Sequence, residues 1–386
     1  MDIKELRNQY ELVDLFCSLA EIPSPSLKEE KVINWITNYC TENGLQCQTD
    51  SYNNIHIQVE ATDSTKQPIL LSAHMDVIGD DSEINLYLDE DLIKAKNRTL
   101  GADDKAGVAN ALYFAKQLVK SNISHGGVEI VFTRDEESGM TGIRNVDFSK
   151  LKSKYVLVLD SDSLGQLLTA GASYTQVKLE VNSFKGGHSG IDIADETREN
   201  AGKLLADLVS EFPQGVYYSE NNQVVTSCNL GGIISGNPEV TNIINTYGLA
   251  TYSIRSSNRE KEEELKNLMK FLTDEFNKEY INIAEAKVTF KEHMPAFEKV
   301  DDDYIPILFE AVAKKNGITP EISSFHAGAE THIYADQTNS AGEKFAPYLV
   351  GLANVCNMHS DKEYVDYKSI LEGQKLLQSL FEAYNC

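Results

Sequence analysis

The chain has 386 residues, enough for two domains, and its 41% hydrophobic and 24% charged residues are typical of a globular protein. Its formal net charge of −24 repels phosphate backbones and anionic lipid, which excludes nucleic acid and membrane surfaces as expected partners. No run approaches the ~20 apolar residues of a membrane span, and the first residues lack the basic start and apolar core of a signal peptide. We therefore expect a cytoplasmic protein with reduced cysteines.

Alternating helix and strand patterns fill the first 173 residues. Helices are predicted over 4–22, 27–42 and about 104–120, and strands near 46–59, 68–73, 84–96, 128–133 and 155–159. Several of these strands are almost wholly apolar, which is typical of strands covered on both faces. The pattern therefore predicts an α/β fold with a mostly parallel sheet flanked by helices.

The pattern changes from residue 174 onward. A half-exposed strand begins at Tyr174, and it is followed by elements in the order helix 197–211, strands 222–233, 240–246 and 248–256, helix 259–278 and a strand near 285–292. This order is close to that of a ferredoxin-like α+β domain. The α/β pattern returns after Pro295 with a strand over 347–352 and a helix over 366–384. The predicted organisation is a first domain made of 1–173 and 294–386, with 174–293 inserted into it.

Five short polar segments mark the ends of these predicted strands, the start of one helix and one loop. They are Ser72 to Asp76, Gly101 to Lys105, Asp135 to Glu137, Val158 to Asp160, and Asn357 to Asp361. His74 and Asp76 lie just past an apolar strand, where open α/β sheets place their ligands. In such a pair the carboxylate can accept from the second ring N–H and fix the histidine tautomer. A satisfied surface histidine is the competing interpretation of this pair alone.

The acidic pair Asp103 and Asp104 stands at a predicted helix start. Helix capping would account for either residue, because a first-turn carboxylate accepts free backbone N–H groups. A tight turn after Gly101 would also present one of them as a carboxylate that bridges two cations, although from these residues alone capping is favoured. Both interpretations stay open from these residues alone.

Further acids follow two apolar strands. Asp135, Glu136 and Glu137 place three negative charges at one strand end, which is costly without cations. Asp160 directly ends the next strand and is preferred over Asp162 for the same role. A solvated loop or a capped turn is the alternative for each of these acids.

His359 is the second histidine of the set, in a loop after the strand over 347–352. If these segments converge on one edge of the sheet, two histidines and several carboxylates meet there. Such donors suit zinc, cobalt or manganese, and they would hold two divalent ions. A spare glutamate could then act as a general base. Calcium is disfavoured because it takes oxygen ligands.

As a set, these motifs resemble the two-zinc peptidases and amidohydrolases that include peptidase T, aminoacyl-histidine dipeptidase, carnosinase, bacterial glutamate carboxypeptidase and acetylornithine deacetylase. The resemblance implies that a metal-bridged hydroxide attacks an amide bond with Glu136 as general base. It implies a cis peptide after the bridging aspartate, and it gives the metal-site roles to His74 (with Asp76 orienting it), Asp103 (bridging), Glu137, Asp160 and His359.

In the inserted domain, which the resemblance identifies as a lid, the segment Gly186 to Gly190 matches a motif whose histidine stabilises an oxyanion. The residue concerned is His188. Arg255 stands where relatives hold a substrate carboxylate, and an arginine fork suits that role. Asn242 matches the usual lid asparagine. A turn or solvated position is the alternative for each, and the family also predicts a homodimer formed through the lid.

The chain departs from the commonest family pattern around Phe325 to His332, where it is similar to the His-Ala-Gly-x-Glu form of aminoacyl-histidine dipeptidases. Glu330 is therefore the candidate for reading a substrate α-ammonium, with a helix-start carboxylate as the alternative. We expect a metallopeptidase that cleaves di- or tripeptides from the amino end. The alternatives are an N-acyl amino-acid amidohydrolase or deacetylase with the same metals, and a non-catalytic metal-stabilised binding protein.

Overall fold

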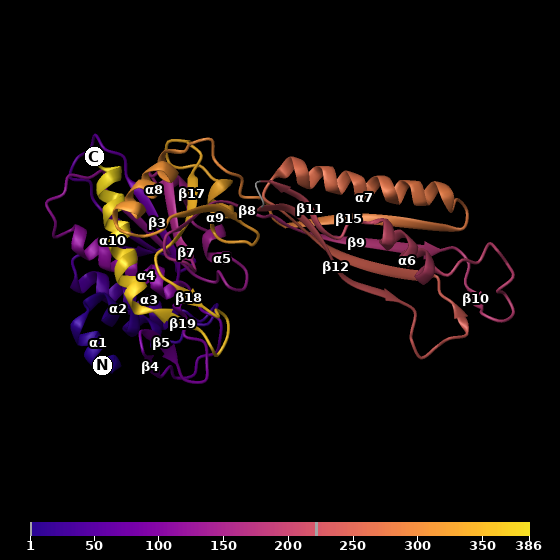
Figure 1. The fold of residues 1–386 in the computed structure, drawn as a ribbon, viewed down its shortest axis with the longest axis horizontal. Helices are drawn as coiled ribbons and strands as arrows, with labels where there is room; N and C mark the ends of the chain where they lie inside the picture. Colours follow the sequence, from indigo (N-terminus) through magenta and orange to yellow (C-terminus); the bar gives the residue numbers. More distant parts are fainter. Residues whose placement is uncertain (1, 221–222) are drawn as a thin grey trace. The chain divides into compact units, whose positions relative to one another are not determined.

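The computed structural model describes residues 2–220 and 223–386, and the chain forms two compact units (Figure 1). The first unit contains the residues up to Thr169 together with Lys299–Ser323 and Ala329–Cys386. The second contains Ala170–Glu298 and the short segment Ser324–Gly328. Within the described residues, no helix is both long enough and apolar enough to cross a membrane.

The first unit is built on an eight-stranded sheet with the order β1-β2-β6-β3-β7-β17-β8-β16. These strands are β1 (Gln46–Thr49), β2 (Ile55–Val59), β3 (Ile69–His74), β6 (Val128–Thr133), β7 (Tyr155–Ser161), β8 (Gln166–Gly171), β16 (Glu321–Phe325) and β17 (Ala346–Gly351). The four central strands β6, β3, β7 and β17 are mutually parallel, whereas β1, β2 and β8 pair antiparallel. The predicted α/β class with a mostly parallel sheet is confirmed, and its parallel pairs are these central strands.

The helices of the first unit cover this sheet and pack on one another. They are α1 (Ile3–Gln9), α2 (Glu11–Ala20), α3 (Glu30–Glu42), α4 (Ala102–Leu118), α5 (Thr141–Arg144), α8 (Tyr304–Lys315), α9 (Thr331–Ala335) and α10 (Tyr367–Tyr384), with a 3-10 turn over Phe148–Lys150. Helix α4 contacts β3 and β7 and also packs on α2 and α10, while α9 packs on β17. Every residue of β3, β6 and β17 is buried. Burial on both sides explains why these strands read as continuous apolar runs.

A small four-stranded sheet of order β18-β19-β5-β4 completes the first unit. It consists of β4 (Leu86–Asp89), β5 (Leu92–Ala95), β18 (Val355–Cys356) and β19 (Tyr364–Asp366). Strands β18 and β19 pair antiparallel, so the loop between them, residues 357–363, lies at the end of a hairpin. This loop carries His359.

The second unit is an antiparallel sheet of order β11-β12-β14-β9-β15 with two long helices. Its elements are β9 (Tyr174–Ser183), α6 (Ala201–Glu211), β11 (Gly215–Glu220), β12 (Gln223–Ser235), β14 (Tyr247–Ser256), α7 (Arg259–Glu279) and β15 (Ala284–Met294). A separate pair joins β10 (Gly187–His188) to β13 (Ile243–Ile244). Apart from the added strand β11, the order of elements is that of the ferredoxin-like arrangement.

Some predicted elements are divided in the structure. The helix expected over 4–22 breaks at Tyr10, whose backbone is extended (φ −129°, ψ 106°), so α1 ends and α2 begins there. The strand expected over 46–59 is the hairpin β1–β2, because Asn53 adopts a positive φ of 64° in the turn. The strand expected over 84–96 is likewise the pair β4–β5. Position 222, the first residue of the strand expected over 222–233, lies outside the described residues.

Candidate metal centre

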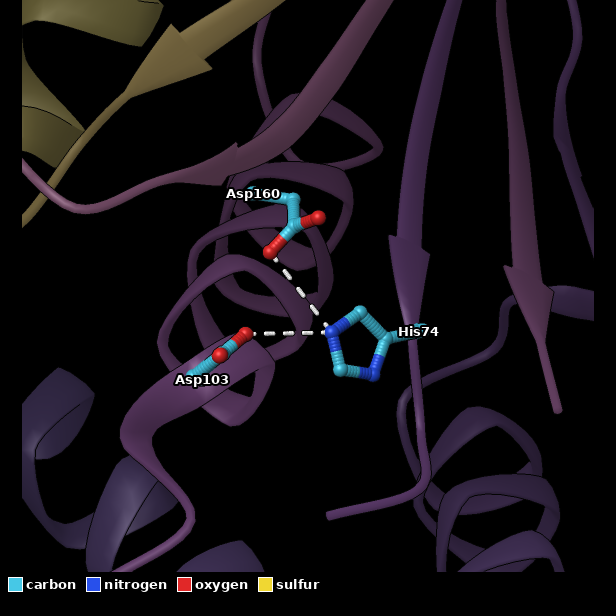
Figure 2. A group of neighbouring side chains, drawn as sticks. All are labelled: His74, Asp103 and Asp160. Atoms are coloured by element: carbon cyan, nitrogen blue, oxygen red, sulfur yellow. Dashed lines mark hydrogen bonds and ion pairs between the residues drawn. The ribbon is translucent and has the colours of Figure 1, made fainter. Parts of the chain in front are cut away.

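His74 is the last residue of β3, and a backbone oxygen orients its imidazole ring. Its Nδ1 lies 2.9 Å from the backbone oxygen of Asp76, an acceptor only, so Nδ1 carries the proton. The Asp76 carboxylate is farther away, with Oδ1 at 3.5 Å. The other ring nitrogen, Nε2, faces two carboxylates, Asp103 Oδ1 at 3.1 Å and Asp160 Oδ1 at 3.5 Å (Figure 2). An imidazole nitrogen and two carboxylates form the first candidate group.

A second candidate group shares Asp103 with the first. Asp103 Oδ2 lies 3.1 Å from Nε2 of His359, and this Nε2 is also 3.1 Å from Glu137 Oε1. Within each group, the potential ligand atoms all lie within 4.8 Å of one another. The two oxygens of one carboxylate thus point toward two different histidines, which is the arrangement of a bridging ligand.

The non-helical first residues of α4 present Asp103 and leave capping to its neighbour. Gly101 adopts a left-handed conformation (φ 74°) that favours glycine, and the Asp103–Asp104 peptide bond is cis, as the resemblance predicts. Asp104 is buried, and its Oδ1 accepts a hydrogen bond from Gly107 N at 3.0 Å. Asp104 is thus engaged with the helix, while Asp103 faces the two histidines.

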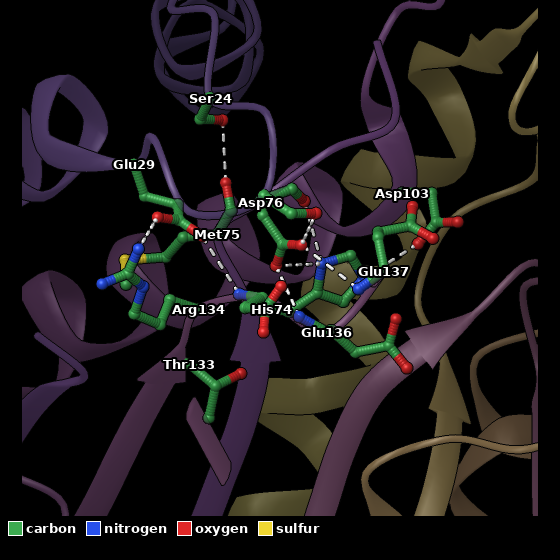
Figure 3. A network of polar contacts seen from close by, with 12 residues as sticks. Ser24, Glu29, His74, Met75, Asp76, Asp103, Thr133, Arg134, Glu136 and Glu137 are labelled. Atoms are coloured by element: carbon green, nitrogen blue, oxygen red, sulfur yellow. Dashed lines mark hydrogen bonds and ion pairs between the residues drawn. The ribbon is translucent and has the colours of Figure 1, made fainter. Parts of the chain in front are cut away.

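The loop after β6 is held by a buried carboxylate. Asp76 is fully buried, and its oxygens accept from Glu136 N at 2.9 Å, Glu137 N at 3.1 Å and Ser26 Oγ at 2.7 Å (Figure 3). Asp135 has a positive φ of 55°, so the chain turns sharply at this point. The Asp76 side chain therefore fixes the two glutamates through their backbone more directly than it fixes the ring of His74.

Glu29 is a second buried support of this loop, and sequence analysis did not find it. Its carboxylate is fully buried and accepts from Asp135 N at 3.1 Å and from Arg134 Nη2 at 2.7 Å (Figure 3). The sequence places Glu29 within the helix predicted over 27–42, whereas α3 begins one residue later. No local pattern marks this role, because Asp135 and Arg134 are more than 100 residues away.

The electrostatics of the cluster fit two divalent cations. Burial, together with neighbouring acids, raises the pKa of Glu136 to about 9 and the pKa values of Glu137 and Asp160 to about 7. Burial also favours a raised pKa at Asp103, but the hydrogen bonds with His359 and His74 outweigh it and lower the pKa. So many buried acids repel one another unless cations offset their charge. Imidazole nitrogen and carboxylate oxygen are donors that zinc, cobalt and manganese accept.

Two nearby acids lie outside both groups. Asp162, the alternative to Asp160, is exposed and accepts a hydrogen bond from the hydroxyl of Ser163. Glu136 is next to Glu137 in the chain but belongs to neither three-residue group. Its carboxylate is thus left for another role.

Glu330 lies below the surface of the first unit. It is 1% exposed, its Oε2 is 3.4 Å from the hydroxyl of Ser72, and that hydroxyl accepts from Tyr334. Burial raises the pKa of Glu330 to about 7. Its side chain makes no capping hydrogen bond to α9. The structure thus brings Glu330 near the strand that carries His74, in a site shielded from solvent.

His188 and Asn242 lie close together in the second unit. His188 Nδ1 accepts hydrogen bonds from Gly190 N at 3.1 Å and Ile191 N at 3.3 Å. Since Nδ1 is the acceptor, the neutral ring carries its proton on Nε2, a donor with no hydrogen-bond partner among the described residues. Asn242 is exposed, and its backbone oxygen accepts from Ser189 N.

Arg255 also belongs to the second unit and is half-buried on a strand. Its guanidinium lies 4.4 Å from the ring centroid of Tyr174, and burial lowers its pKa. Among the described residues, no carboxylate forms an ion pair with it. Ser227 is opposite Arg255 on β12 and bonds to Nε2 of His326, a residue of the short 324–328 segment. An arginine without an acidic partner is available to bind an anion.

Comparisons with known proteins identify the family. Residues 70–383 match the sequence profile of peptidase family M20/M25/M40. The chain is similar to the cytosol non-specific dipeptidase of Escherichia coli K12, with 31% identity over 229 residues, 52% of this chain and 46% of that protein. The aligned part thus spans about half the length of the dipeptidase.

Two further similarities extend over almost the whole chain. Peptidase T of Listeria monocytogenes serotype 4a (strain HCC23) is 25% identical over 388 residues, covering 97% of this chain and 87% of that protein. The crystal structure of aminopeptidase PepT from Bacillus cereus superposes with a TM-score of 0.85 at 24% identity, covering 97% and 98% of the two chains. The resemblance inferred from the sequence is confirmed, and the chain belongs to peptidase family M20/M25/M40.

Proposed function

We propose that the chain is a two-metal metallopeptidase that hydrolyses amide bonds in small peptides, most simply di- or tripeptides attacked from the amino end. The observation that carries this proposal is the pair of histidine–carboxylate groups joined by Asp103, with the unshared carboxylate of Glu136 beside them. Membership of a peptidase family supports the reaction class.

Two divalent cations would be held by the two groups, with zinc the first choice and cobalt or manganese compatible with the same donors. His74, Asp103 and Asp160 would hold one cation, and Asp103, Glu137 and His359 would hold the other. When bound, the cations would supply Lewis acidity at the amide carbonyl and a nucleophile at neutral pH.

Glu136 is the proposed general base. Its carboxylate would accept a proton from the attacking water and return it to the leaving amine nitrogen, so that one residue serves both halves of the reaction. The backbone clamp from Asp76 to Glu136 N would keep this carboxylate in place while the proton moves. Bound cations would lower the raised pKa of Glu136 toward the range in which it can accept a proton.

The second unit would provide the donors that recognise the substrate. The free Nε2–H of His188 suits a developing oxyanion, with Asn242 beside it as a further polar contact. Arg255, which has no acidic partner among the described residues, suits the carboxylate of a free peptide.

A second candidate function, hydrolysis of N-acyl amino acids with the same metals, is favoured by one observation. Glu330 would read a substrate α-ammonium in a peptidase, yet it is 1% exposed and already contacts Ser72. One observation supports the peptidase role of Glu330: its Oε1 is buried without a hydrogen-bond partner among the described residues, so it can accept one more donor. An N-acyl substrate would not need this residue.

A homodimer formed through the second unit is also proposed. Strand β11 pairs with β12 only up to Cys228, and among the described residues no strand pairs with the β12 edge from Asn229 to Ser235 on that side. Ile233 and Ile234 on this segment are 48% and 65% exposed. Unpaired apolar edges favour pairing with another chain.

We also propose a cytoplasmic location, since neither charge nor sequence predicts a nucleic-acid or membrane partner.

A paired substrate assay separates the two functions. The metal-loaded protein would be given free dipeptides and tripeptides in one series, and N-acetylated amino acids with the same side chains in the other. We expect turnover of the free peptides. Turnover confined to the N-acetylated series would instead make the chain an amidohydrolase.

A further inference from the structure

The buried carboxylate of Glu363 grips the backbone turn that presents Asp103. Glu363 is 2% exposed. Its Oε2 accepts from Gly101 N at 2.9 Å and from the hydroxyl of Thr99, and its Oε1 accepts from Ala102 N at 2.8 Å and Asp103 N at 3.4 Å. One side chain thus accepts every backbone N–H from Gly101 to Asp103.

This turn needs an external acceptor. Gly101 is left-handed, and the backbone angles of Asp103 and Asp104 are not helical, so regular helix hydrogen bonds do not fix the turn. The first N–H groups of a helix have no partner within the helix itself, and a carboxylate is their strongest acceptor. Glu363 supplies that acceptor from a segment about 260 residues away.

Glu363 is also the last residue of the loop that carries His359. Its neighbour Tyr364 starts β19 and is paired with both Cys356 and Lys94, which anchors the base of the hairpin. Four residues earlier in the same loop, His359 Nε2 reaches Asp103 Oδ2 at 3.1 Å. The loop therefore touches the Asp103 segment twice, through the histidine ring and through the Glu363 carboxylate.

We propose that Glu363 is a positioning residue that sets the separation of His359 and Asp103 and so tunes the second cation site. The inference rests on the proposed two-cation function. Groups that orient metal ligands typically change metal affinity 10- to 100-fold when they are removed. Glu363 would act on the shared ligand and on one histidine at once, so its loss should weaken the His359 group more than the His74 group.

Glu129 provides a matched control. It is also a buried carboxylate of the first unit, 4% exposed, and it accepts from Lys152 N at 3.0 Å, from Ser153 N at 2.9 Å and from the Ser153 hydroxyl. It lies at the start of β6, at the opposite end from the loop that carries Glu136. Glu129→Gln therefore removes a similar set of hydrogen bonds without touching the ligand-bearing segments.

The experiment compares wild type, Glu363→Gln, Glu129→Gln and the milder Thr99→Val, which removes only one donor to Glu363. Each full-length protein is first freed of metal with a chelator. Zn²⁺ and Co²⁺ affinities are then measured by competition with a chromophoric chelator. The Co²⁺ absorption spectrum and the thermal midpoint of the metal-free protein are recorded as well. We expect both glutamine variants to lose thermal stability. Of these two, only Glu363→Gln should also bind the lower-affinity ion 10- to 100-fold less tightly and change the Co²⁺ spectrum. Thr99→Val should show a smaller loss of affinity for the same ion.

Two results would overturn the inference, and they are distinguishable. If wild type binds two ions, and Glu363→Gln and Thr99→Val each bind both ions as tightly as wild type does, Glu363 has no positioning role, while the proposed function stands. If wild type itself binds no divalent ion, the proposed function fails and the inference fails with it. Should Glu363→Gln not fold, unchanged metal affinity in Thr99→Val would be the refuting result.

Discussion

Replacing Asp76 with asparagine removes the clamp that holds the loop carrying Glu136 and Glu137. Asp76 is fully buried, and its two oxygens accept from the N–H groups of both glutamates and from Ser26. Asparagine keeps one oxygen, but its amide group faces N–H of Glu137, a donor that then has no acceptor. Hydrogen bonds to a charged group are worth about 1.5–3 kcal/mol, and a buried unpaired donor costs about 1–3 kcal/mol.

From these contributions, Asp76→Asn should lower the free energy of unfolding of the metal-free protein by roughly 2–4 kcal/mol. Because the displaced loop carries Glu137, affinity for divalent ions should fall about 10- to 100-fold. Urea unfolding of the chelated protein measures the first quantity, and competition with a chelator measures the second. Asp162→Asn is the control, since Asp162 is exposed and its replacement should change stability by less than about 0.5 kcal/mol. The reasoning is refuted if Asp76→Asn and Asp162→Asn behave alike in both assays.

Three further predictions concern other residues. Glu330→Gln should lower kcat/KM for free dipeptides about 10- to 100-fold and leave N-acetylated substrates unaffected; equal effects on both series, measured by amine release, would remove its amino-end role. His188→Gln should reduce kcat about 10²- to 10³-fold at unchanged metal content, and a normal kcat would contradict its role as oxyanion donor. The hydrogen bond from Lys154 lowers the pKa of Asp302 to about 2, so this carboxylate stabilises the fold above pH ~4, and the effect is lost as pH falls toward 2. Asp302→Asn should cost roughly 1–2 kcal/mol at pH 7 after allowance for the half-exposed lysine, and a difference from wild type in urea midpoint that persists near pH 2 would count against this assignment.

The strand ends were predictable from the sequence because a parallel sheet brings the carboxyl ends of its strands to one edge. An apolar run followed by a histidine or an acid is therefore a local signal with a tertiary meaning, and it led to His74 and Asp160. These residues alone did not decide whether Asp103 caps the helix or bridges two cations, since capping and bridging use the same local sequence. The structure separates the two residues of the pair, because the Asp104 carboxylate accepts a hydrogen bond from Gly107 N.

The supports of the site could not be predicted in the same way. Glu29 and Glu363 act on backbone N–H groups more than 100 residues away, so neither has a local pattern that would distinguish it from a surface acid. No local pattern marks the 324–328 segment either. It lies in the part of the sequence predicted for the first domain but packs in the second unit. The break at Tyr10 was hidden by apolar spacing that continues across it.

The most direct test of the central claim is peptide hydrolysis by the chelated protein after zinc, cobalt or manganese is returned, with wild type and Glu136→Gln assayed side by side for turnover and for bound metal. The proposed function predicts that wild type regains turnover of free-ended peptides, and that the variant binds two ions but turns over about 10²- to 10⁴-fold more slowly. Full turnover by metal-free wild type, or by metal-loaded Glu136→Gln, would contradict it.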